Sequence, residues 1–200
     1  MPVTVIVRRQ ARPGQVEALL AQAQARLRIT AQRRDRRLEA WVFQSRTDPH
    51  ALLWVSRWES LAAYWTRMQA LGGVDQLDVL CAAPADRYVC RQIALYEELT
   101  HAPAVVNCVL VRTPPKACEQ TLQYLLEESG PAVRRLPGLT LRGLYQDCDK
   151  PTYFFIIHGW ESLARFEDHE RAVHPGFQAR GEELGARIEY FMGVPRAHAD

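Results

Sequence analysis

The chain has 200 residues, of which 48% are hydrophobic and 24% are charged, and its formal net charge is +2. This composition is ordinary for a globular protein, and so small a charge gives no electrostatic reason to expect nucleic acid or a membrane as a partner. No apolar run approaches the roughly 18 residues of a membrane-spanning helix, and the first seven residues do not resemble a signal peptide.

The cysteines indicate a reducing compartment. They are odd in number and include no Cys-x-x-Cys pair: Cys81, Cys90, Cys108, Cys118 and Cys148. This usage is typical of free thiols in the cytoplasm, where we expect the protein, and a catalytic cysteine is the less favoured alternative.

The first half of the chain predicts two helices among four strands. Apolar and β-branched residues predict strands at 3–7, 38–44, 51–58 and 87–95. Apolar positions at helical spacing predict one helix from Gln15, and another that is capped by Ser60 and ended by Gly72-Gly73. We interpret an arginine-rich run at 33–37 as a solvated loop or helix end, and 74–84 as a short helix or loop.

The second half predicts the same order after a linker at 97–104. Strands are expected at 105–111, 139–145, 152–159 and 187–193, and helices from Cys118 and from Ser162. His174 precedes Pro175, which predicts a break or loop in the last helix, because the residue before a proline disfavours the helical conformation.

A repeated pentapeptide indicates that the two halves are copies of one unit. Trp-Glu-Ser-Leu-Ala occurs at 58–62 and again at 160–164, a spacing of 102 residues. Such a repeat indicates an internal duplication, whose copies we place at 1–98 and 103–200. Each copy has the β-α-β-β-α-β order of a ferredoxin-like repeat, so the predicted fold class is α+β.

Some strands are apolar on both faces. The segments 105–111 and 153–157 consist almost entirely of apolar residues, whereas an antiparallel sheet with one solvated face alternates apolar and polar residues. We therefore expect helices on one face of each sheet and the sister sheet on the other. The two repeats would then pack sheet to sheet as an intramolecular, pseudo-dimeric α+β barrel.

The second half also carries a family pattern. A glycine-containing strand at 138–147 precedes an apolar strand at 153–160, then Glu161-Ser162, His169 and His-Pro-Gly-Phe at 174–177. This pattern resembles the antibiotic biosynthesis monooxygenase (ABM) domain, and the chain is similar to two copies of it, of which the second follows the pattern more closely. The resemblance implies an oxygenase that needs no cofactor and acts on a small aromatic or quinol-like substrate between the sheet and the helices. Activating oxygen in this way requires an electron-rich substrate, a base and a pocket with little water.

Two polar residues of the second half are the candidate catalytic residues. Asn107 interrupts an apolar strand, where a buried amide needs a hydrogen bond, and it could orient a substrate oxygen. His169 lies on the last predicted helix, beside its apolar face, and could act as a base near neutral pH. The alternatives are an amide bonded to water or backbone and an exposed surface histidine. Their counterparts in the first half are Val3 and Arg67, so only the second repeat could carry these roles.

Four more residues are candidates for substrate binding: Trp160, His174, Phe166 and Tyr145. Aromatic side chains at strand and helix spacing belong to a core more often than to a cleft, and the presence of Trp58 in the first copy favours packing for Trp160. His158, late in a strand, is interpreted as a core histidine or a further site residue. No metal site is predicted, because His169 and His174 are five residues apart and no third ligand is evident.

The sequence leaves three hypotheses open. The first is a cofactor-independent monooxygenase, and the second is a non-enzymatic domain that binds a small molecule or serves as a scaffold. The third is heme binding and degradation, which is disfavoured because residues 178–181, where such relatives carry an axial histidine, contain none. The expected partner is a small aromatic molecule, and formation of a homodimer stays open.

The predicted packing of the repeats can be tested by separating them. Covalent linkage gives each repeat a high effective concentration of the other, so we expect the barrel to form within one chain. Residues 1–98 and 103–200 expressed separately are expected to be insoluble, or to associate when they are mixed. If each half is a stable and soluble monomer by sedimentation, the sheet-to-sheet interface does not exist.

Overall fold

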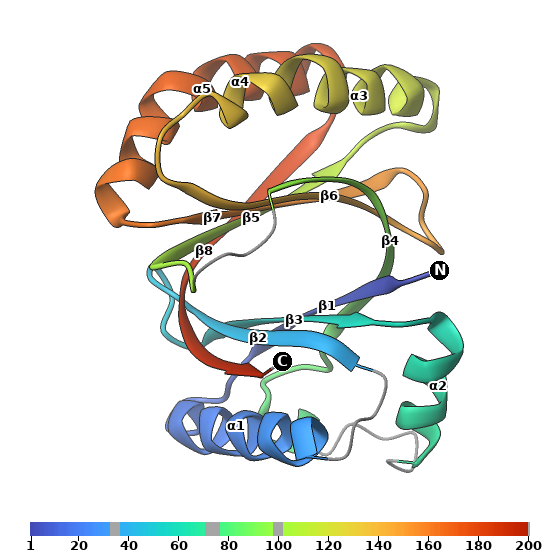
Figure 1. Cartoon of the computed structure of the whole chain (residues 1–200), viewed down its shortest axis with the longest axis vertical. Coiled ribbons are helices and arrows are strands. Elements are labelled where there is room, and N and C mark those ends of the chain that lie inside the picture. Colours follow the sequence, from blue (N-terminus) through green and yellow to red (C-terminus); the bar gives the residue numbers. More distant parts are fainter. Residues whose placement is uncertain (33–36, 71–76, 98–101, 200) are drawn as a thin grey trace. The chain divides into compact units, whose positions relative to one another are not determined.

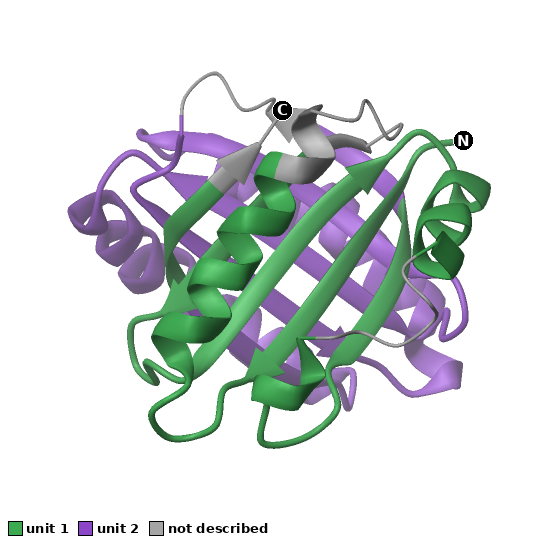
Figure 2. Ribbon diagram, turned by 90° about the horizontal axis from the view of Figure 1, so that it is seen from below, with its two compact units in different colours: residues 1–91, 193–200 green, residues 92–192 purple. Residues whose placement is uncertain are grey.

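The computed structural model describes residues 1–32, 37–70, 77–97 and 102–199. Most of the arginine run at 33–37, the predicted helix end at Gly72-Gly73 and the centre of the linker lie outside these residues. The chain divides into two compact units, coloured in Figure 2: unit 1 is Met1–Arg91 with Gly193–Asp200, and unit 2 is Gln92–Met192. None of the described helices is long and apolar enough to cross a membrane.

Unit 1 is an antiparallel sheet with helices on one face (Figure 1). It contains β1 (Val3–Gln10), α1 (Val16–Gln32), β2 (Arg37–Ser45), β3 (Ala51–Trp58), α2 (Leu61–Ala70), η1 (Asp78–Leu80) and the first half of β4 (Asp86–Glu97). The strand order is β4-β1-β3-β2-β8, in which β8 (Arg187–Ala199) supplies its second half. Leu19, Leu20 and Leu27 of α1 belong to its core, which confirms the apolar helix face that the sequence predicts.

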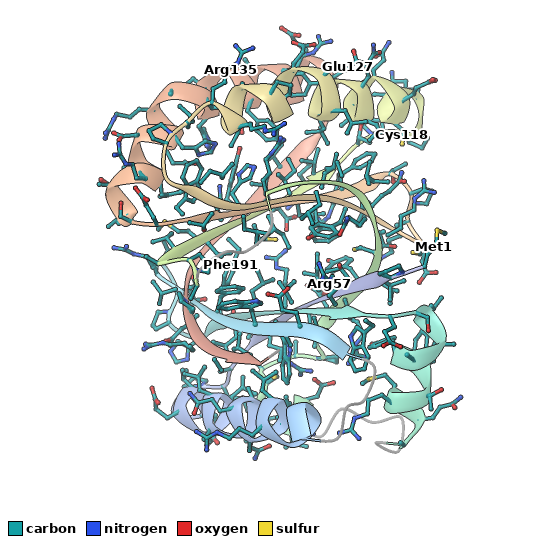
Figure 3. All side chains as sticks on the ribbon, viewed as in Figure 1. Met1, Arg57, Cys118, Glu127, Arg135 and Phe191 are labelled. Atoms are coloured by element: carbon teal, nitrogen blue, oxygen red, sulfur yellow. The ribbon has the colours of Figure 1, made fainter. Side chains whose placement is uncertain are left out.

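Unit 2 has the same arrangement with a longer helical layer. It contains the second half of β4, β5 (Val105–Arg112), η2 (Pro115–Ala117), α3 (Cys118–Tyr124), η3 (Leu125–Ser129), α4 (Gly130–Arg134), β6 (Leu139–Asp147), β7 (Tyr153–Trp160), α5 (Leu163–Glu183) and the first half of β8. The strand order is β8-β5-β7-β6-β4. The helices α3, α4 and α5 cover one face of the sheet (Figure 1), and Figure 3 shows Glu127 and Arg135 on the outer side of this layer.

The predicted element order is confirmed in both repeats, so the chain is an α+β protein of two ferredoxin-like repeats. Two strands, β4 and β8, are longer than predicted, and each begins in one unit and ends in the other. The boundaries of the units therefore fall inside these strands and differ from those of the repeats 1–98 and 103–200. The helix predicted from Cys118 is divided by a π-helical turn, η3, between α3 and α4.

The strand register fixes which residues of the two repeats correspond. In both repeats a valine of the first strand lies opposite the tryptophan of the repeated pentapeptide, Val3 in unit 1 and Val105 in unit 2. Asn107 therefore corresponds to Val5, and the expected counterpart Val3 is wrong. Aligning the two first strands two residues out of register keeps every side chain on the same face of the sheet, so the apolar pattern alone does not reveal the error. Either counterpart is a valine, and the first repeat has no amide at this place.

The break predicted at Pro175 is also wrong, because α5 continues through this proline to Glu183. A proline inside a helix removes one backbone donor and leaves the carbonyl four residues earlier without its partner. Here Pro175, Gly176 and Arg171 are all exposed, so water can bind the released carbonyl of Arg171. His174 is therefore a helical residue, and it lies one turn after Glu170.

The serine of each repeated pentapeptide caps the helix that follows, as the sequence predicts for Ser60. Ser60 Oγ accepts a hydrogen bond from the backbone N–H of Ala63 at 3.1 Å, and Ser162 Oγ accepts one from Arg165 at 3.3 Å. Each hydroxyl satisfies one of the N–H groups that a helix leaves without a partner at its first turn. The two caps fix where α2 and α5 begin.

Removal of the α5 cap is expected to destabilise the protein. Ser162→Ala should lower the free energy of unfolding by about 1 kcal/mol, because one helix N–H loses its acceptor. Urea unfolding followed by circular dichroism measures the change. Ser162→Asp keeps an acceptor and should retain most of the stability, so an equal loss in both variants would contradict the capping role.

Candidate functional site

A cavity lies between the sheet and the helices of unit 2. It is lined by residues of β5, β7, β8, η3, α4 and α5, and its empty volume is about 300 Å³ including the open mouth. Only about 20 Å³ of this space admits the centre of a water molecule, which is room for one or two waters. Its polar lining includes Asn107, His158, His169, Glu170, His174 and Tyr190.

The floor of the site is a row of polar residues across three strands. Asn107 of β5 lies opposite His158 of β7, which lies opposite Arg142 of β6. Directly paired residues project from the same face of a sheet, and this face is the one that the helices cover. All three residues are at least 97% buried, and Arg142 Nε donates a hydrogen bond to His158 Nε2 at 3.2 Å.

His158 is held in its neutral form. Burial lowers its pKa well below the ordinary value, and the positive charge of Arg142 and the nearby His169 lower the pKa further. Each cause acts by disfavouring a positive charge on the imidazole. The ring accepts a hydrogen bond from Arg142 and therefore remains a neutral side chain at physiological pH.

His169 reaches the site from α5 and is fixed by aromatic rings. Its ring centroid lies 4.9 Å from that of Trp160, 5.4 Å from that of His158 and 6.4 Å from that of Phe166. Only 5% of His169 is exposed. Trp160 and Phe166 thus hold the imidazole in place, and neither belongs to the lining of the cavity.

Glu170 joins the buried histidine to one nearer the surface. Its carboxylate lies 3.5 Å from His169 Nδ1 through Oε1 and 3.1 Å from His174 Nδ1 through Oε2. The side chains of Glu170 and His174 are 32% and 31% exposed, whereas that of His169 is 7% exposed. These three groups form a continuous series of titratable atoms from the cavity to solvent.

Tyr190 of β8 closes the outer side of the site. Its ring lies 4.7 Å from the ring of His174, and its hydroxyl donates a hydrogen bond to Gln178 Oε1 at 3.3 Å. Burial and then the negative charge of Glu170 raise the pKa of Tyr190 to about 12, because both disfavour a phenolate. The phenol therefore stays protonated at physiological pH and acts as a donor.

The structure brings most of the predicted site residues together. Asn107, His169 and His174 line the cavity, and Trp160 and Phe166 contact His169 from behind. Tyr145 does not line the cavity. Its neighbour Leu144 packs in the helix-side core, so Tyr145 projects from the opposite face of the sheet.

Three residues of the site were absent from the sequence-based candidates: Arg142, Glu170 and Tyr190. Arg142 interrupts an apolar strand, which is the same signal that singled out Asn107 on the strand before it. Glu170 is four residues before His174, which is one helical turn, so a continuous α5 would have placed the two side chains together. The predicted break at Pro175 concealed this pair.

The match to known families lies in the first repeat. Residues 2–71 match the family model described as Antibiotic biosynthesis monooxygenase. The first repeat is therefore similar to an ABM domain over these residues. We expected the second repeat to follow the family pattern more closely, but the matched residues all precede it. A search of curated proteins returns no match.

Solved structures share the fold of the whole chain. A proposed monooxygenase from Fusobacterium nucleatum subsp. nucleatum is 7% identical, with a TM-score of 0.79 over 100% of this chain and 94% of that one. An anthrone oxidase-like protein is 10% identical, with a TM-score of 0.75 over 98% and 92%. A proposed monooxygenase from Lactobacillus acidophilus is 10% identical, with a TM-score of 0.74 over 99% and 95%. Likenesses at such low identity show the fold alone.

The first repeat lacks the polar row. The strand pairing puts Val5, Ser56 and Ala40 at the places of Asn107, His158 and Arg142. Ser56 Oγ accepts a hydrogen bond from Trp58 Nε1 at 3.0 Å, so its hydroxyl serves to hold the tryptophan. Within the described residues, no group of three or more histidine, cysteine or acidic side chains in either unit is arranged to hold a metal ion.

The neutral state of His158 predicts how stability depends on pH. Below about pH 6.5, the ordinary pKa of histidine, the unfolded chain binds a proton at His158 that the folded chain does not bind, so stability is present above this pH and falls below it. His158→Gln should flatten the fall by up to about 1.4 kcal/mol per pH unit, measured by urea unfolding from pH 8 to pH 5. An unaltered slope in His158→Gln would show that the buried ring binds protons in the folded chain.

Proposed function

We propose that the chain is an oxygenase of the ABM type, which oxidises a small aromatic or quinol-like molecule in the cavity of unit 2 without a cofactor. One observation carries this proposal: an amide, Asn107, and a buried imidazole, His169, meet in a cavity with apolar walls. The match of residues 2–71 to the ABM family model and the likeness to an anthrone oxidase-like fold support it.

His169 is the base of the proposed reaction. The Glu170 carboxylate near its Nδ1 favours the tautomer with the proton on Nδ1, which leaves the lone pair on Nε2. This nitrogen takes a proton from the substrate, and Asn107 holds the oxygen on which the negative charge of the enolate develops. The proton can pass through Glu170 to His174 and so to solvent.

The enolate then supplies the electrons that reduce oxygen. For a substrate of the anthrone type, a methylene becomes a carbonyl, one atom of O₂ enters this carbonyl and the other leaves as water. The substrate provides all four electrons, so the balance needs no other reductant. Apolar walls such as Val109, Ile156 and Val173 keep water from the carbanion.

The size of the cavity sets a condition on this reaction. Room for one or two waters does not hold an aromatic ring, so side chains must move when the substrate enters. Phe177 is a wall shared with a second, apolar cavity between α3, η3 and α5, which has an empty volume of about 210 Å³. Rotation of this ring would join the two spaces and admit the body of a planar substrate.

The tightness of the cavity also favours a second candidate function, a domain that binds a small molecule without transforming it. In that case the same residues would recognise a ligand of a few atoms, and no oxygen would be consumed. The two functions differ in a direct measurement.

Oxygen uptake with a panel of anthrones and quinols tests the proposal. We expect uptake with at least one compound and one water formed per substrate oxidised. His169→Ala is expected to lower kcat by about 10²–10⁴-fold, because the base is lost. Asn107→Ala should lower kcat as well, since the enolate oxygen loses its donor.

Arg67→Ala is the matched control, because Arg67 occupies the place of His169 in unit 1. It should leave the rate unchanged. If the folded protein consumes no oxygen with any compound of the panel, this result would count against an oxygenase and in favour of the binding domain. An unchanged rate in His169→Ala would remove His169 from the reaction.

A further inference from the structure

One buried hydrogen-bond donor of the cavity has no role so far. His158 is 3% exposed and lines the cavity, and its Nδ1 is buried without a hydrogen-bond partner among the described residues. Buried polar groups of folded proteins are almost always hydrogen-bonded, so such an atom in a cavity wall marks a place for a ligand. What Nδ1 can bind depends on whether it carries the proton.

The neighbouring arginine decides this. A guanidinium has only donors and does not lose its proton in proteins, so the hydrogen bond from Arg142 Nε requires a lone pair on His158 Nε2. The ring is neutral and must carry its one proton on Nδ1. A ring flipped by a half turn would present a C–H group to Arg142, and the bond would be lost.

The shape of the ring directs this N–H away from Arg142. Nε2 and Cδ2 form one edge of an imidazole, and Nδ1 and Cε1 form the other. Arg142 lies on β6, on one side of β7, and the cavity is lined from β5 and β8, on the other side. The edge with Nδ1 therefore faces the side of Asn107 and the cavity.

We propose that His158 Nδ1–H is a second donor to the ligand oxygen that Asn107 holds, that Arg142 is the positioning residue that fixes this tautomer, and that the cavity therefore selects molecules with an enolate or phenolate oxygen. This inference rests on the proposed function, because it concerns the same cavity and names the class of substrate that the proposed oxygenase would bind. It assigns His158 a role opposite to that of His169: one ring donates, and the other accepts.

The charge around the site favours an anionic oxygen over a neutral one. Arg142 places a positive charge behind the donor. This charge polarises the imidazole and strengthens the hydrogen bond from Nδ1–H to a negative oxygen. The carboxylate of Glu170 also lines the cavity, where it lies near the imidazoles of His169 and His174.

The tautomer can be tested in the native chain. Protein labelled with ¹⁵N-histidine is examined by long-range ¹H–¹⁵N correlation at neutral pH, with His158→Gln to assign the signals. We expect a protonated Nδ1 and an unprotonated Nε2 for His158. A proton on Nε2, or a doubly protonated ring, overturns the proposal.

The ligand class is tested with 4-nitrophenol, whose phenolate absorbs visible light, and with 4-nitroanisole, which has no ionisable oxygen. We expect 4-nitrophenol to bind as the phenolate and to titrate at lower pH when bound than when free. His158→Phe, which keeps Arg142 but removes the N–H, and Arg142→Met should each weaken phenolate binding about tenfold or more, the loss of one charge-assisted hydrogen bond.

Arg135→Met is the control, because it removes the same charge from the outer side of the helical layer (Figure 3) and should bind the phenolate like the native chain. Absence of 4-nitrophenol binding, equal affinity for 4-nitroanisole, or undiminished binding by His158→Phe overturns the proposal. If the chain binds the phenolate but consumes no oxygen with any anthrone or quinol, this inference stands and the proposed oxygenase function is wrong.

Discussion

A guanidinium that cannot lose its proton lies inside the apolar layer between the sheet and the helices of unit 2. Arg142 is fully buried there, and the polar residues near it are arranged around its charge. Burial and then the charge of Arg142 lower the pKa of His158 and keep it neutral, and the hydrogen bond from Arg142 orients its ring. His158 in turn lies beside Asn107 and near His169. Burying such a charge costs free energy that well-packed apolar residues would not cost, so stability alone does not explain its presence.

The comparison of the two repeats separates the fold from the site. Unit 1 has the same strands, the same serine cap and the same tryptophan, and it completes the row with Val5, Ser56 and Ala40. A ferredoxin-like repeat therefore folds with small or apolar residues in these three places. The polar row of unit 2 is an addition that the fold tolerates, and the tryptophan that packs beside a serine in unit 1 packs beside an imidazole in unit 2.

The sequence predicts the fold well because its signals are local and repeated. Strand composition, helical spacing and the two serine caps each depend on a few neighbouring residues, and the second copy repeats them. The site depends on tertiary geometry, and the sequence predicts only part of it. Asn107 and His169 stand out as polar residues in apolar patterns, whereas the contact of Glu170 with both histidines requires α5 to continue through Pro175. The side of the sheet on which Tyr145 lies follows from register, which composition does not give.

Two imidazoles with centroids 5.4 Å apart acquire different chemistry from their neighbours. The cation beside His158 donates to the lone pair of Nε2, which leaves an N–H on Nδ1. In the proposed reaction the Glu170 carboxylate, 3.5 Å from His169 Nδ1, favours the proton on that atom and so leaves a lone pair on Nε2. Opposite environments acting on like groups are the usual way in which one site obtains both a donor and an acceptor. Since Glu170 also contacts the half-buried His174, the proposed oxygenase could pass a proton from the cavity to solvent without opening the apolar walls.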